Sequence, residues 1–268
     1  MYVFLNVNAN NRSHLAQAAL ENVDGREVMS NADNLHTLEL AENWIKTCYN
    51  NHTECNWSSA GTAVEEPLLP TRVIDVSPTQ NVVTTPGSTV RLVHSDRGRG
   101  KWVALSHRWG SGDVLRLIES NRKTFQEGID VSSFPATFRD AVDITRALSV
   151  RYLWIDSLCI LQDSPSDWQA ESAKMPEIYQ NAYATIAAAA TDSTHGGILV
   201  ERDFLSSSSK RCILPVIRDG KEGSVTVDRL HKPLESTETN SLKTRAWCFQ
   251  ESQLSHRSEE HTSELQSQ

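Results

Sequence analysis

The residues best suited to chemistry follow two short apolar runs, each of the length of a buried strand. Trp102–Leu105 is followed by the segment Ser106–Gly110, Ser-His-Arg-Trp-Gly, and Tyr152–Ile155 is followed by Asp156. Ligands bind beyond the carboxyl ends of strands in open α/β sheets, so these polar groups are expected to converge on one crevice. The candidate ligand-binding or network residues are Ser106, Arg108, Trp109, Asp156, Gln162 and Asp163.

Each of these candidates also has a purely structural interpretation. Asp156 is equally suited to capping a turn or a helix, and an ion pair between Arg108 and Asp156 would brace the two loops. Large tryptophans such as Trp109 are more often packing residues than stacking platforms for a ligand. A third polar segment, Thr244–Glu251, contains Arg245, Gln250 and Glu251, and it suits either a site at the end of the sheet or the start of a surface helix.

Two cysteine arrangements were considered. Cys48, His52 and Cys55 supply three ligand types of a zinc site, but no fourth ligand follows at a recognisable spacing, so a buried cysteine pair is favoured over a metal. Cys159 with His107 would make a nucleophile and base. Its neighbours Leu158 and Ile160 are apolar and would raise the pKa of the thiol, which favours a buried core cysteine.

Composition excludes several classes of function. The 268 residues carry a net charge of −8 with no long basic run, so nucleic acid is not an expected partner. The basic segment Arg97–Lys101 is interpreted as a solvated turn, because no strand precedes it as a phosphate-binding loop requires. No apolar stretch approaches the ~20 residues of a membrane span. Five cysteines without a regular framework are typical of a reducing compartment, and we expect a cytoplasmic protein.

The elements that position these residues alternate between strands and helices. Helices are predicted at about 35–49, 113–120, 135–149 and from Ser164 onward, with a break at Pro176. Strands are predicted at 72–76, as an edge strand, and at 89–93, 102–105, 152–155 and 184–190. This alternation predicts an α/β fold with a mostly parallel sheet flanked by helices. The runs 213–217 and 224–227 read as a β-hairpin added to that core.

The predicted domain organisation has three parts. Residues 1–66 form a helical or irregular N-terminal extension, residues 67–255 form the domain with its core at about 102–251, and residues 256–268 form a tail that is not native. The segment Arg257–Ser267 resembles the conceptual translation of a sequencing-library adapter, and it is polar with no apolar face. We therefore expect a gene model that stops artificially near Ser255.

Three blocks of the sequence together resemble the signature blocks of the fungal heterokaryon-incompatibility (HET) domain. The likeness spans roughly Trp44 to Leu254 in order and spacing, and His107 stands where the family usually has tyrosine. The blocks are Trp102–Gly110, Arg151–Asp163 with Trp168, Glu171, Met175 and Ile178–Tyr179, and Arg245–Glu251; the segments Leu69–Asp75 and Cys48–Cys55 resemble the usual lead-in.

The resemblance implies non-self recognition between fused fungal cells that ends in programmed cell death. It implies action through self-association and protein partners, and a core like that of the flavodoxin-like TIR domains. Because some TIR domains cleave NAD through a glutamate, the alternative is a hydrolase that takes NAD as its substrate. Glu171 and Glu251 would then be the candidate catalytic carboxylates, and Arg108 or Arg245 would hold the pyrophosphate. No Gly-x-Gly-x-x-Gly is present, so ordinary dinucleotide binding is not supported, and no cofactor is assigned.

Overall fold

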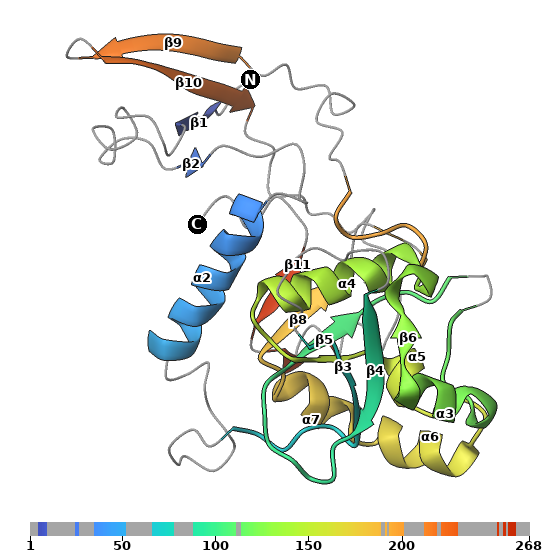
Figure 1. Ribbon diagram of the computed structural model, residues 1–268. Helices are drawn as coiled ribbons and strands as arrows, with labels where there is room; N and C mark the ends of the chain where they lie inside the picture. The colour runs from blue at the N-terminus through green and yellow to red at the C-terminus, as the bar shows by residue number, and fades with distance from the viewer. Residues whose placement is uncertain are drawn as a thin grey trace. The chain divides into compact units, whose positions relative to one another are not determined.

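The computed structural model of the chain divides by its contacts into two units, each described separately below (Figure 1). Unit 1 comprises Met1–Asn34, Val200–Thr239 and Thr262–Gln268, and unit 2 comprises Leu35–Leu199 and Asn240–His261. The residues that the structure describes are 5–9, 25–26, 35–51, 66–77, 88–110, 114–188, 191, 193–200, 212–218, 221–229, 251, 254–255 and 257–260.

Unit 1 contains a four-stranded sheet with the order β2-β1-β10-β9. Its strands are β1 (Leu5–Ala9), β2 (Gly25–Arg26), β9 (Cys212–Arg218) and β10 (Lys221–Arg229). The predicted hairpin is present as the antiparallel pair β9–β10, but it pairs with β1 and is not a strand pair of the core sheet. The N-terminal segment was expected to be helical or irregular, and it instead supplies β1, whose backbone covers the free edge of β10.

Unit 2 is built on a seven-stranded sheet with the order β11-β8-β5-β7-β3-β4-β6. Its strands are β3 (Arg72–Asp75), β4 (Thr89–His94), β5 (Trp102–Ser106), β6 (Ile129–Asp130), β7 (Tyr152–Trp154), β8 (Ala184–Ala187) and β11 (Ser258–Glu260).

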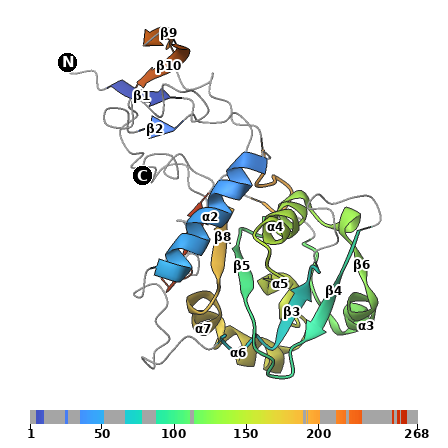
Figure 2. The same cartoon turned by 60° about the vertical axis from the view of Figure 1, so that its left-hand side comes forward.

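This sheet is mixed, so the expectation of a mostly parallel sheet is not confirmed. The pairs β11–β8, β8–β5 and β5–β7 are parallel, whereas β7–β3, β3–β4 and β4–β6 are antiparallel. The parallel pairs β5–β7 and β8–β5 belong to strands that are separated in the chain by helices, as crossover connections require. The mixed α/β class itself is present, with helices flanking the sheet (Figures 1 and 2).

Strand β3 is an interior strand, although its alternating sequence predicted an edge. It lies between β7 and β4, and all four of its residues are buried. Both charged residues, Arg72 and Asp75, are buried because each has charged partners described below. Pro70 lies two residues before the strand, so it takes no place in the ladder.

The helices of unit 2 mostly match the predicted ones. They are α2 (Leu35–Asn51), α3 (Glu119–Glu127), α4 (Ala136–Ala147), α5 (Asp156–Cys159), α6 (Pro165–Ser172) and α7 (Met175–Gln180), with a 3-10 turn, η2, at Val131–Ser133. The helix predicted at 113–120 is wrong, because helix α3 begins only at Glu119, after an irregular stretch. The predicted break near Pro176 is present, since α6 ends at Ser172 and α7 starts afresh at Met175.

The hydrophobic core of unit 2 lies on both faces of its sheet, since every residue of β3 and β5 is buried. Trp102 is the first residue of β5, and Trp154 is the last residue of β7. Each is 1% exposed. The Trp102 indole donates to the Ile178 carbonyl at 3.2 Å, and the Trp154 ring meets Tyr179 edge-on with centroids 5.6 Å apart. Both tryptophans therefore bind helix α7 to the sheet, and full burial of such rings supplies a large share of the hydrophobic stabilisation.

Helix α2 lies beside the edge of the sheet that β11 and β8 form (Figures 1 and 2). Its Tyr49 ring packs against Tyr183 with centroids 5.3 Å apart, and the Lys101 ammonium lies 4.1 Å from the Tyr49 ring centroid. Arg257 lies over the same two rings. Cation–π contacts of this kind, together with buried Ile45, attach α2 to the sheet.

Strand β11 falls in the segment that was assigned to a tail. It pairs in parallel with β8, from Ser258↔Thr185 to Glu260↔Ala187. Pairing at a sheet edge uses backbone groups, so the polar sequence of this segment is compatible with it.

Candidate functional site

The end of strand β5 carries a buried pair between Ser106 and Glu251. The Ser106 hydroxyl donates to the Glu251 carboxylate, and the two residues are 4% and 7% exposed. The Ser106 carbonyl accepts from the Ala188 amide at 2.9 Å, just after β8. A hydroxyl that donates to a carboxylate favours its ionised form. The structure thus places one buried carboxylate at the carboxyl ends of β5 and β8.

Asp156 joins the loops that follow β5 and β7. Its carboxylate accepts from the Trp109 indole at 2.9 Å and from the Ser157 amide at 2.7 Å. The imidazole Nδ1 of buried His107 lies 3.8 Å from the same carboxylate. Trp109 and Asp156 thus join the loops that follow β5 and β7, whereas Ser106 pairs with Glu251.

Arg108 lies half-buried in the same loop, between His107 and Trp109. Among the described residues it forms no ion pair, so the expected pair with Asp156 is absent there and the indole of Trp109 takes that place. An arginine held beside a carboxylate-anchored tryptophan suits an anionic or aromatic ligand group.

Gln162 and Asp163 brace the neighbouring loops and do not contact the Asp156 carboxylate. The Gln162 amide donates to the carbonyls of Asp156 and Ile160 at 3.1 and 3.0 Å. The Asp163 carboxylate accepts from the backbone amide of Glu119, at 3.1 Å to each oxygen, and so satisfies the first turn of α3. Both residues therefore stabilise the loops next to the site.

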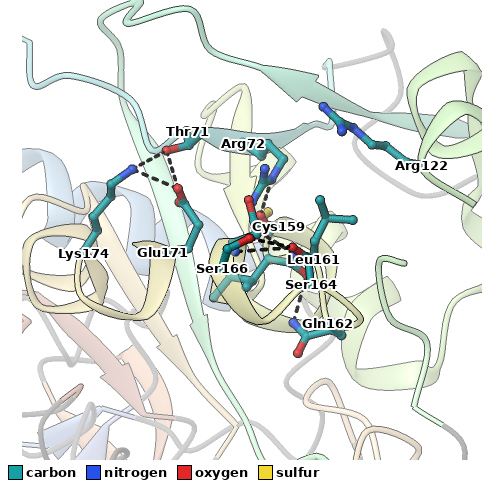
Figure 3. A network of polar contacts seen from close by, with 12 residues as sticks. Thr71, Arg72, Arg122, Cys159, Leu161, Gln162, Ser164, Ser166, Glu171 and Lys174 are labelled. Carbon is teal, nitrogen blue, oxygen red and sulfur yellow. Dashed lines mark hydrogen bonds and ion pairs between the residues drawn. The ribbon is translucent and has the colours of Figure 1, made fainter. Parts of the chain in front are cut away.

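Glu171 lies in a separate cluster on helix α6 (Figure 3). It is 4% exposed, and its carboxylate accepts from the Thr71 hydroxyl and from the Lys174 ammonium, each at 2.9 Å. Lys174 also donates to Thr71 at 3.0 Å, which closes a triangle of three partners. Through this one oxygen, Glu171 links α6 to Thr71, the residue before β3.

Sequence reasoning missed the arginine that organises the loop after β7. Arg72, 5% exposed, donates to the Cys159 carbonyl at 2.6 Å and pairs with Asp167 at 2.5 Å (Figure 3). Asp167 also accepts from the Leu161 amide at 2.9 Å. This clamp holds α5 and α6 against β3. A charged residue inside a short strand was the available signal, because such a residue is seldom buried without a partner.

Cys159 is a buried core cysteine. Burial raises the pKa of its thiol to about 12, against a smaller lowering by the hydrogen bond with the Ile155 backbone. The thiolate is therefore almost absent near neutral pH, as the apolar neighbours predicted.

We expect thiol reagents at pH 8 to modify Cys159 only as fast as the chain unfolds. Labelling should be followed by peptide mass spectrometry, with the half-buried Cys48 as the internal comparison. The rate at Cys159 should rise by at least about a hundredfold in denaturant. Equal rates for Cys159 in the folded and the unfolded chain would contradict this assignment.

Several candidates lie outside the described residues. These are Arg245, Gln250, His52 and Cys55, so neither the Arg245 site nor the complete Cys48 cluster is described. Within the described part of the chain, no three His, Cys, Asp or Glu side chains are grouped to hold a metal. In that same part, no helix has the length and apolar character of a membrane span.

The tryptophans divide between packing and surface. Trp102 and Trp154 are core residues, as favoured from the sequence, and Trp109 is half-buried at the site. Trp168, on helix α6, is 49% exposed and is one of three large hydrophobic residues that the described surface exposes. A large exposed aromatic side chain is a common anchor in protein interfaces.

Comparison with known proteins gave one match. The model of the family described as "Heterokaryon incompatibility protein (HET)" matches residues 102–251, which is more than half of the chain. The match begins at Trp102, the first residue of β5, and ends at Glu251, so the Ser106–Glu251 pair and Asp156 lie within it. No curated protein and no solved structure matched.

Proposed function

Because the chain belongs to the heterokaryon incompatibility (HET) family, we propose that it acts in non-self recognition and triggers programmed cell death through self-association and partner binding. The family match over 102–251 is the observation that carries this proposal. The exposed indole of Trp168, on a helix that the Arg72–Asp167 ion pair joins to β3, supports it. We place this action in the cytoplasm, on the grounds of cysteine usage.

Self-association should depend on Trp168. Replacing Trp168 with serine is expected to weaken association by about 10- to 30-fold, as loss of an aromatic anchor does. Because the side chain is 49% exposed, the melting temperature should stay within about 1–2 °C of wild type. Size-exclusion chromatography with light scattering over a concentration series measures the association.

The matched control is Trp168→Phe, which keeps an aromatic anchor and should associate nearly as wild type. A wild-type chain that remains monomeric at every soluble concentration would contradict self-association. A serine variant that associates like wild type would leave self-association intact and remove Trp168 from it.

The parallel half of the sheet supports a relationship to flavodoxin-like folds, and hence to TIR domains. Counted along the chain, its parallel strands are β5, β7, β8 and β11, and their spatial order corresponds to 2-1-3-4. Flavodoxin-like sheets have the order 2-1-3-4-5 and bind ligands where the order reverses, between the first and third strands. In this chain that point lies between β5 and β8, beside Ser106 and Glu251.

This position favours a second function, the cleavage of NAD with Glu251 as the catalytic carboxylate. The bond between ribose C1′ and the pyridinium nitrogen would break, and its electron pair would leave with nicotinamide. The carboxylate would stabilise the oxocarbenium-like C1′, and water would add there and release a proton. The Ser106 hydroxyl donates to the carboxylate, Trp109 offers a ring for stacking, and Arg108 offers a cation for the pyrophosphate.

A further inference from the structure

Strand β3 ends in Asp75, a buried carboxylate whose two oxygens both already accept hydrogen bonds. Asp75 accepts from Arg151 at 3.2 and 2.9 Å, from Arg91 at 3.3 Å, and from the Ser77 amide and hydroxyl at 3.0 and 2.6 Å. Burial alone would raise the pKa of Asp75, and the hydrogen bonds from Arg151 and Ser77 reverse this and hold it well below its ordinary value. Asp75 thus has no oxygen left for another cation.

A third arginine, Arg146, lies at the same end of the strand, and its hydrogen-bonding capacity is only partly used. Arg146, on helix α4, is 3% exposed and donates through Nε to the Val76 carbonyl at 3.0 Å. Its Nη1 and Nη2 atoms are buried, and among the described residues they have no hydrogen-bond partner. Burial lowers the pKa of Arg146, and Asp143 one turn earlier partly offsets that. A buried guanidinium with both terminal nitrogens unpaired is costly and implies a missing acceptor.

The three arginines bond to two neighbouring residues, Arg91 and Arg151 to the Asp75 carboxylate and Arg146 to the Val76 carbonyl. Arg91 faces Asp75 across the β3–β4 ladder, and the Arg151 carbonyl accepts from the Val76 amide at 3.0 Å. Three positive charges therefore face two negative ones, Asp75 and Asp143. The Arg91 and Arg151 side chains are 57% and 54% exposed, whereas the terminal nitrogens of Arg146 are buried, so an anion from solvent would meet Arg91 and Arg151 first and would reach Arg146 only when that side chain becomes accessible.

We propose that Arg146, Arg151 and Arg91 bind a phosphate-type oxyanion at this end of β3. Adjacent terminal nitrogens of a guanidinium form a planar fork that pairs with two oxygens of a phosphate, and arginine is the side chain best suited to that geometry. The surplus of positive charge favours an anion with more than one charge. The ligand is either free phosphate or the phosphate group of a small molecule such as a nucleoside monophosphate.

This site is distinct from the candidate site at the carboxyl ends of the parallel strands. Asp75 pairs with Tyr152, the first residue of β7, whereas Asp156 follows the last residue of that strand. A bound oxyanion would therefore contact β3, β4, α4 and the start of β7, at the opposite end of β7 from the candidate site.

The test uses the full chain and the variant Arg146→Met, which replaces the buried cation with an apolar side chain of similar length. In phosphate-free buffer this variant should melt at or above the wild-type temperature, because an unpaired buried charge is removed. Phosphate at constant ionic strength should raise the melting temperature of wild type and leave Arg146→Met unchanged. Calorimetric titration with phosphate should show at least about tenfold weaker binding to the variant.

Two further variants control the experiment. Arg139→Gln changes an exposed arginine of the same helix and should bind phosphate as wild type does. Arg91→Gln changes an exposed member of the site and should bind about threefold more weakly while folding normally. Titration with adenosine monophosphate beside inorganic phosphate distinguishes the two sources, since only a nucleotide ligand gains affinity from the nucleoside.

Three results would overturn the proposal. The first is that phosphate stabilises wild type no more than chloride does at equal ionic strength, and the second is that it stabilises Arg146→Met equally. An Arg146→Met variant that melts below wild type in phosphate-free buffer would identify Arg146 as a structural brace instead.

Discussion

Replacing Glu251 with glutamine is expected to lower NAD turnover by the purified chain by about a hundredfold or more. Glutamine keeps an oxygen that accepts from Ser106, so the fold should tolerate the change, but it removes the negative charge that would stabilise the oxocarbenium-like centre. Loss of nicotinamide release in a chromatographic assay, with an unchanged melting temperature, is the expected outcome.

Glu171→Gln is the matched control, because Glu171 is a second glutamate buried to a similar degree in the same unit. Its Oε1 oxygen accepts from Thr71 and Lys174, so the change should leave turnover within about threefold, and because this carboxylate is buried it should cost about 1–3 kcal/mol of stability. Turnover that depends on Glu171 and not on Glu251 would contradict the assignment. Wild-type protein that is folded and assembled but releases no nicotinamide would remove the enzymatic alternative and leave the signalling proposal standing.

Replacing Asp75 with asparagine is expected to lower the free energy of unfolding by about 3 kcal/mol, because it removes one partner of a buried ion-pair network. Arg151 and Arg91 lose their counter-ion, and two more donors replace an acceptor at the end of β3. Chemical denaturation measures the loss. Asp130→Asn is the control, since the exposed Asp130 carboxylate accepts from Ser132 in the 3-10 turn and its replacement should cost far less.

The network around Asp75 also makes the free energy of unfolding depend on pH. The folded-state pKa of Asp75 lies below its ordinary value of 3.8, so its contribution is complete above that value and is lost as the pH falls toward the folded-state pKa. We expect wild type to lose stability between about pH 5 and pH 2 more steeply than Asp75→Asn does. Parallel slopes for the two proteins in this range would contradict an ionised Asp75 in the fold.

The convergence of Trp109 and Asp156 was accessible from the sequence because it depends on local features. An apolar run of strand length that turns polar marks a strand end, and parallel neighbours bring their ends to one edge. The same reasoning identified Cys159 as a core residue, since the apolar character of its neighbours alone indicates burial.

The partners of the buried charges could not be predicted, because they lie far away in the chain. Thr71 and Glu171 are 100 residues apart, and Arg72 and Asp167 are 95 apart. Without these contacts the alternating sequence of 72–76 predicted an edge strand, and the alternation of strands and helices predicted a mostly parallel sheet. The contact of Glu171 with Thr71 was hidden for the same reason, whereas its ion pair with Lys174 spans only three residues.

The most direct test of the central proposal, that this HET-family chain triggers cell death, is survival after its induced expression in a filamentous fungus. Colony counts should be taken at matched protein levels for wild type, Trp168→Ser and Trp168→Phe. The account predicts that wild type and Trp168→Phe reduce survival by at least about tenfold, and that Trp168→Ser, folded but weakly associating, does so far less. Unchanged survival with abundant, folded, self-associated wild-type chain would contradict it.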